Sequence, residues 1–157
     1  MAVARRVLLA ALAMPVAATA QEEPVLELQG AIDPPAPRRL TLSQIDAFGR
    51  VELITRTPWT MGPQRFAGLP IRQLLAAVGS RGTTIRAVAL NDYALSMPIA
   101  EVVADDGFLA THQDDAPIPV RSRGPFWIIF PWSRRPDLET AANRRRAVWQ
   151  LQRMDIA

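Results

Sequence analysis

Tryptophan and arginine side chains at expected loop positions are the residues of this sequence best suited to binding. Trp59 follows Pro58 at the end of an expected strand, and Trp132 comes directly after a long apolar run. Trp149 stands three residues after Arg146. Planar indole rings stack on flat heterocycles, and a few polar groups among apolar ones are typical of small-molecule pockets. The pattern therefore indicates a site for a flat ligand.

Each of these aromatic residues also has a purely structural interpretation. Trp127 is expected to be core, whereas core packing and ligand contact stay equally open for Trp59 and Trp132. Arg146 and Trp149 fit a cation–π pair or a helix cap as well as a ligand role.

The acidic residue best placed for a ligand is Asp92, between Asn91 and Tyr93. A carboxylate there could accept hydrogen bonds from an amidine-like edge of a ring. The arginines at positions 144–146 are most simply the basic end of a helix, favoured by its dipole.

The residues that commonly build catalytic or metal centres are scarce. The single histidine, His112, has no evident Ser or Asp partner and is expected to be structural or exposed. The acidic pairs at 105–106 and 114–115 lie beside turn signals, where solvated carboxylates are common. The sequence contains no cysteine, which excludes thiol catalysis and thiolate ligation of a metal.

The elements that must position these residues are organised around the run GPFWIIFP at residues 124–131. A short apolar run between prolines predicts a strand buried on both faces. Residues 60–68 are expected to form a loop. We predict further strands at residues 25–29, 51–56, 84–90, 94–97, 108–112, 118–121 and 147–154, and helices at 41–48, 69–78, 99–103 and 137–145. These elements define an α+β fold with a mixed β-sheet and a few short helices.

The first 20 residues have the pattern of a cleaved signal peptide. Arg5 and Arg6 precede a short apolar stretch, and Ala18 and Ala20 form a small-x-small cleavage signal. We expect an exported, periplasmic chain with one domain at residues 21–157 that does not span the membrane after cleavage. Without the leader, the chain has 16 cationic and 15 acidic residues, a net charge of +1. This charge does not indicate nucleic-acid binding.

Three stretches, in this order, resemble the molybdopterin-binding domain of the sulfite oxidase superfamily. They are FAGLPIRQLL at 66–75, NDY at 91–93 with SMP at 96–98, and the run at 124–131. The closing RAVWQL at 146–151 resembles short exported members of that superfamily. The resemblance covers residues 51–154.

One departure from the superfamily bears on function. The enzymes bind molybdenum through a cysteine, and the matching position here is Thr55, a poor substitute for a thiolate. The sequence therefore looks most similar to short periplasmic members that bind pterins without catalysis. Those members pass the signal to a membrane-bound cyclic-di-GMP enzyme or kinase. We expect a binding protein rather than an enzyme, with pterin as a non-covalent ligand.

The resemblance also implies site residues. Trp59 or Tyr93 would stack on the pterin, and Asp92 would accept from its 2-amino edge. The other expected contacts are Thr55, Arg56, Arg123, Trp132, Arg146 and Trp149. Two alternatives stay open: a molybdopterin-dependent oxidoreductase subunit without the cysteine ligand, and an interaction module with a vestigial pocket.

Overall fold

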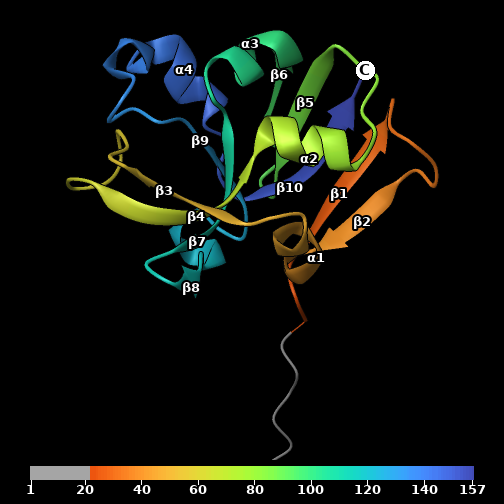
Figure 1. Ribbon diagram of the computed structural model, residues 1–157, viewed down its shortest axis with the longest axis horizontal. Coiled ribbons are helices and arrows are strands. Elements are labelled where there is room, and N and C mark those ends of the chain that lie inside the picture. Colours follow the sequence, from red (N-terminus) through yellow and green to blue (C-terminus); the bar gives the residue numbers. More distant parts are fainter. Residues whose placement is uncertain (1–21) are drawn as a thin grey trace, which may run out of the picture.

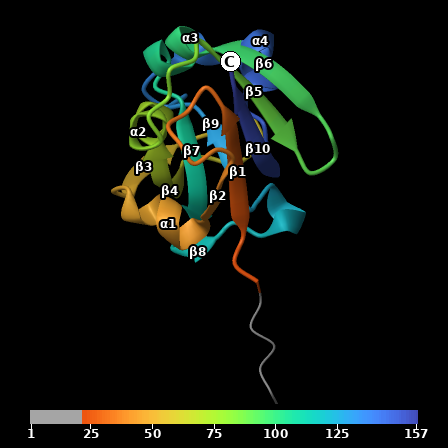
Figure 2. The same cartoon turned by 90° about the vertical axis from the view of Figure 1, so that its right-hand side faces the viewer.

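The computed structural model describes residues 22–157, so the expected leader lies outside the described residues. Within this range, ten strands form two five-stranded sheets with short helices around them (Figures 1 and 2). The expected α+β fold with mixed strand pairing is confirmed. Within the same range, no helix combines the length and apolar character needed to cross a membrane.

The first sheet has the strand order β2-β1-β10-β5-β6 and stands on the right in Figure 1. Its central strand, β10, pairs in parallel with β1 and antiparallel with β5. The first and last described strands are therefore direct neighbours. The strand bounds are β1 (Val25–Gly30), β2 (Arg38–Thr41), β5 (Thr84–Ala89), β6 (Ala94–Pro98) and β10 (Leu151–Ile156).

The second sheet has the order β3-β4-β7-β8, and β9 also pairs with β7. Its strands are β3 (Val51–Thr55), β4 (Gln64–Pro70), β7 (Phe108–Gln113), β8 (Ala116–Pro117) and β9 (Trp127–Ile129). Gly68 lies in β4 where a β-carbon would collide with the carbonyl oxygen of Leu109. Only glycine permits this approach of β4 to β7.

Short helices connect the strands. They are α1 (Leu42–Ala47), α2 (Ile71–Ala77), α3 (Ile99–Ala104) and α4 (Ala141–Arg146), with 3-10 turns η1 (Val120–Ser122) and η2 (Pro136–Leu138). A capping box begins α1. Thr41 Oγ1 accepts from the Gln44 amide at 3.2 Å, and the Gln44 side chain accepts from the Thr41 amide at 2.9 Å. In Figure 1, α3 and α4 lie together at the top of the molecule.

The run at 124–131 is buried throughout, as expected, and forms the centre of the core. Phe126, Trp127 and Phe130 are wholly inaccessible to solvent. Only Trp127–Ile129 joins a sheet, as β9. Pro125 and Pro131 flank this segment and have no N–H to extend the pairing.

The predicted loop at residues 60–68 was wrong, because Gln64–Pro70 forms β4. Phe66 and Leu69 are buried in this strand, but Gly68 and Pro70 interrupt the apolar pattern that would predict a strand from the sequence. Pro70 ends β4 and is the N-cap of α2, so the helix begins at Ile71 rather than at 69. The strand β2 follows the proline-rich connector and was not predicted.

Three predicted boundaries near the C-terminal end were also wrong. Residues 118–121 are not a strand but run into η1, because Pro119 has no N–H for strand pairing. The predicted helix at 137–145 is divided into η2 and α4, and Thr140 caps the second part. The last strand begins at Leu151 rather than at 147, after Gln150 adopts a left-handed backbone with φ of 50°.

Candidate functional site

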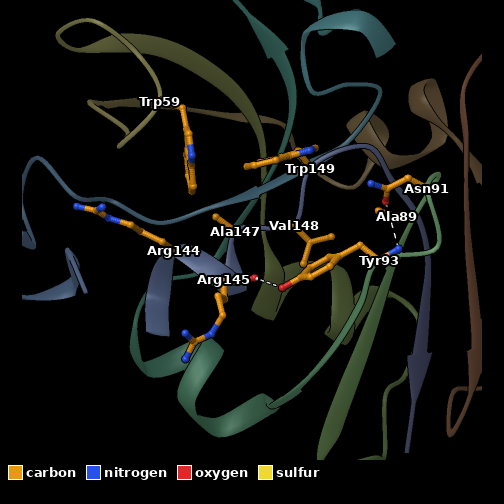
Figure 3. Close-up of a pocket in the computed structure, with 9 residues that line it drawn as sticks. All are labelled: Trp59, Ala89, Asn91, Tyr93, Arg144, Arg145, Ala147, Val148 and Trp149. Carbon is orange, nitrogen blue, oxygen red and sulfur yellow. Dashed lines mark hydrogen bonds between the residues drawn. The ribbon is translucent and has the colours of Figure 1, made fainter. Parts of the chain in front are cut away.

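A cavity of about 380 Å³ opens between the β3–β4 loop, the β5–β6 turn and the segment that joins α4 to β10. We call it the aromatic cavity (Figure 3). Its volume lies in the range of small-molecule pockets. Its lining consists of Trp59, Ala89, Asn91, Tyr93, Arg144, Arg145, Ala147, Val148 and Trp149.

All four tryptophans of the chain meet around Trp59. Its ring centroid lies 5.3 Å from that of Trp149, 5.9 Å from that of Trp127 and 6.1 Å from that of Trp132. The pairs are tilted or edge to face, which suits aromatic quadrupoles. Trp127 and Trp132 are fully buried, so this cluster anchors the loop that carries Trp59.

Threonine side chains hold the loop that carries Trp59. The hydroxyl of Thr57, which is buried, accepts from the Trp59 amide at 3.2 Å. The hydroxyl of Thr60 accepts from the Thr57 amide at 3.1 Å. These bonds fix the backbone on both sides of Pro58, so the indole of Trp59 is directed inward.

Trp149 forms a second wall of the aromatic cavity and is 37% exposed. The guanidinium of Arg123 lies 5.3 Å from the centroid of Trp127 and 5.8 Å from that of Trp149, so it contacts both rings. Gln150 donates its backbone N–H to the Arg123 carbonyl at 2.8 Å. Arg123 therefore supports the wall from behind and does not line the cavity.

The β5–β6 turn supplies the polar part of the lining. The side-chain oxygen of Asn91 accepts from the Tyr93 amide at 3.1 Å, and the Tyr93 hydroxyl donates to the Arg145 carbonyl at 3.2 Å. The first bond holds the turn itself, and the second ties the turn to α4 (Figure 3). Asp92, between them, is exposed with φ of 65° and is not among the lining residues.

Thr55 is fully buried at the end of β3, and its hydroxyl is already occupied. It donates to the Arg56 carbonyl at 2.9 Å and accepts from the Ser133 amide at 3.0 Å. A neutral hydroxyl used in this way does not suit molybdenum ligation. Residues 22–157 also contain no group of three or more His, Asp or Glu residues placed to hold a metal ion.

Arg56, Trp132 and Arg146 belong to the scaffold around the aromatic cavity. Arg56 pairs with Glu139 at 3.0 Å, and the indole N–H of Trp132 donates to the Leu138 carbonyl at 3.2 Å. Arg146 pairs with Asp105 at 2.7 Å. None of the three lines the cavity, so the structure brings Trp59, Tyr93 and Trp149 together there and leaves the other expected contacts outside.

The lining also contains residues that the sequence did not mark as ligand contacts. The sequence predicts a helix end for Arg144 and Arg145, where the structure also places them, and gives Asn91 no role beyond its position next to Asp92. Nothing in the sequence marks the small residues Ala89, Ala147 and Val148 as cavity-lining residues.

His112 lies in a separate polar cluster at the β4–β7 pairing. Its Nδ1 is 2.8 Å from the Thr111 hydroxyl, which in turn lies 3.1 Å from Asp46, and its Nε2 is 3.4 Å from Arg50. Because a guanidinium only donates, Nε2 accepts and Nδ1 carries the proton. Burial lowers the pKa of His112, opposed by the charges of Asp46 and Asp115.

The chain belongs to the oxidoreductase molybdopterin-binding domain family, whose model matches residues 13–134. The crystal structure of the sulfane dehydrogenase SoxCD from Paracoccus pantotrophus shares its fold, with a TM-score of 0.63 and 19% sequence identity. The alignment covers 85% of this chain but only 38% of that one. No curated protein matches the chain.

Proposed function

We propose that this chain is a periplasmic, non-catalytic pterin-binding protein that reports ligand binding to a membrane-bound signalling partner. Membership of a molybdopterin-binding family supports a pterin-type ligand. The observation that carries the proposal is the aromatic cavity, in which Trp59, Tyr93 and Trp149 present ring surfaces to a flat heterocycle.

The proposal of a binding role without catalysis rests on Thr55 and on the composition. Thr55 occupies the position expected for the thiolate, and its hydroxyl bonds within the chain. The sequence has no cysteine to replace it. A pterin needs no such ligand, because stacking and hydrogen bonds suffice to hold it.

The expected leader and the proposed binding role support export and signalling. The pattern at residues 1–20 supports transfer to the periplasm. A protein that only binds acts through whatever recognises its bound state. A membrane-bound cyclic-di-GMP enzyme or kinase fits this requirement, because it can carry the signal from the periplasm to the cytoplasm.

The test is a titration of the mature protein with a reduced pterin, followed by tryptophan fluorescence. We expect saturable quenching, because Trp59 and Trp149 line the aromatic cavity. Trp59→Ala should abolish saturation, whereas Trp59→Phe should retain part of it. Met61→Ala is the matched control, because Met61 is in the same loop, is 95% exposed and does not line the cavity.

A molybdopterin-dependent oxidoreductase without the cysteine ligand is the second candidate. The description of the family as an oxidoreductase domain favours it. Elemental analysis of the purified protein separates the two candidates. Stoichiometric molybdenum without pterin quenching would favour the oxidoreductase. If the protein shows neither pterin quenching nor molybdenum, an interaction module with a vestigial pocket remains.

A further inference from the structure

Strand β3 is an unprotected edge of the second sheet. Among residues 22–157 it pairs only with β4, at the end of the order β3-β4-β7-β8 (Figure 2). Proteins usually protect such edges with prolines, with very short strands or with a covering helix. At the other end of this order, β8 has two residues and contains Pro117. The five residues of β3, Val51–Thr55, include no proline, so this edge can accept another strand.

The backbone groups of alternate residues in β3 point away from β4. Opposed residues in an antiparallel pair alternate between hydrogen-bonded and non-hydrogen-bonded pairs. Ile54 lies opposite Arg65, whose carbonyl accepts from the Asp114 amide at 2.9 Å on the other side of β4. The pair of Ile54 and Arg65 is therefore non-hydrogen-bonded, and the N–H and C=O of Ile54 point to the open edge. The same direction holds for Glu52 and Arg56, because each is two residues away from Ile54.

The side chains of these three edge residues lie on the exposed face of β3. Leu53 and Thr55 alternate with them and are buried. Ile54 is 64% exposed, although it is a large apolar residue within a strand. Glu52 and Arg56 stand on either side of it with opposite charges, and their side chains are 59% and 48% exposed. The open edge thus carries an acid, an apolar residue and a base, in this order along the chain.

We propose that β3 pairs antiparallel with β3 of a second copy of this chain, about a twofold axis at Ile54. In this register the two Ile54 residues lie opposite each other, and Glu52 of each copy lies opposite Arg56 of the other. Opposite charges directly across two strands stabilise their pairing, and the symmetry makes this contact occur twice. A register centred on Leu53 would instead place Arg50 opposite Arg56. The second sheets of the two copies become one continuous sheet.

The contacts that the edge residues make within one chain are compatible with this pairing. Glu52 lies 3.5 Å from Arg65, and Arg56 lies 3.0 Å from Glu139. Ion pairs between exposed side chains contribute little to stability, so Glu52 and Arg56 can turn toward a second copy. The Arg56 amide donates to Ser133 Oγ at 2.8 Å, so the backbone of Arg56 contributes only its carbonyl to the new pairing.

The test is sedimentation velocity of the mature protein over a range of concentrations. We expect a monomer–dimer equilibrium with a Kd in about the micromolar range, because the interface is small, and a dimer that weakens as salt is raised. Glu52→Arg and Arg56→Glu each place like charges opposite each other at both pairs. Each variant alone should dimerise at least about tenfold more weakly. An equimolar mixture of the two variants restores opposite charges, so it should form the dimer again.

Arg39→Glu and Glu101→Arg are the matched controls, because they make the same charge changes at exposed positions of β2 and α3. Both should dimerise as the unaltered protein does, and circular dichroism checks that every variant is folded. A protein that stays monomeric at all concentrations would overturn the proposal. A dimer that both β3 reversals leave intact, or a mixture of folded variants that stays monomeric, would also overturn it. Pterin binding is measured separately and does not depend on these outcomes.

Discussion

The indole rings of Trp59 and Trp149 meet edge to face, with centroids 5.3 Å apart and an angle of 83° between their planes. Trp59 comes from the β3–β4 loop of the second sheet, and Trp149 comes from the segment that enters the central strand of the first. The contact therefore joins the two halves of the fold at the wall of the aromatic cavity. The same two rings serve packing and the proposed binding.

Trp59→Ala should destabilise the protein by about 2–3 kcal/mol, less than for a fully buried tryptophan because Trp59 is only partly covered. The loss comes from its contacts with Trp127, Trp132 and Trp149. Urea unfolding followed by circular dichroism measures it. Trp149→Ala, at a more exposed position, should cost about 1 kcal/mol. Equal losses of stability in Trp59→Ala and Trp149→Ala would contradict the central position of Trp59 in the tryptophan cluster.

Neighbouring arginines on α4 should differ sharply in their effect on stability. The side chain of Arg146 is 14% exposed, pairs with Asp105 at 2.7 Å and lies over the ring of Phe130. Arg146→Ala should lower the free energy of unfolding by about 2–3 kcal/mol, because it leaves the Asp105 carboxylate without this partner. Arg145→Ala, at an exposed position, should change it by less than about 0.5 kcal/mol. Denaturant midpoints of the two variants give the comparison.

Acid should destabilise the protein in part through His112. Burial lowers the pKa of His112 below its usual 6.5, so the unfolded chain binds a proton more readily than the folded one. This contribution to stability is fully present above pH 6.5 and is lost as the pH falls through the folded pKa. The free energy of unfolding measured across this window should fall less steeply in His112→Gln. If the unfolding free energy of both proteins falls equally with pH, His112 does not contribute to this loss of stability.

The expected signal peptide leads to a prediction about processing. In a bacterial host, mass spectrometry of the periplasmic fraction should find a mature chain that begins near Gln21, after the small residues Ala18 and Ala20. Ala20→Leu should block cleavage, because a bulky side chain replaces the small one at the cleavage signal. Full-length protein retained in the cytoplasm would rule out the signal peptide.

Much of the fold could be predicted from local sequence signals. The predicted helix that begins near Thr41, the predicted helix that contains α2 and the buried run at 124–131 each depend on short-range chemistry, and each is confirmed. The strand β4 could not be predicted, because it depends on pairing with β3 and β7 and contains Gly68 and Pro70. Its partners lie far away in the sequence, where local patterns carry no information.

The candidate site could be predicted only in part for a related reason. Aromatic residues at loop positions marked Trp59, Tyr93 and Trp149, and all three line the aromatic cavity. The sequence could not show that the β5–β6 turn directs Asn91 rather than Asp92 to the cavity, because side-chain direction in a turn follows from its dihedral angles. Nor could it show that α4 would present Arg144 and Arg145 beside the aromatic walls.

The position of β10 between β1 and β5 has a consequence for the order of folding. During synthesis, the β1–β2 pair and the β5–β6 pair cannot be joined until β10, Leu151–Ile156, has been made. Contacts between such distant segments slow folding, because a long loop must close before they form. The first sheet can therefore be completed only after synthesis has reached β10. Until then, proteins that hold or transport unfolded polypeptides can bind the chain.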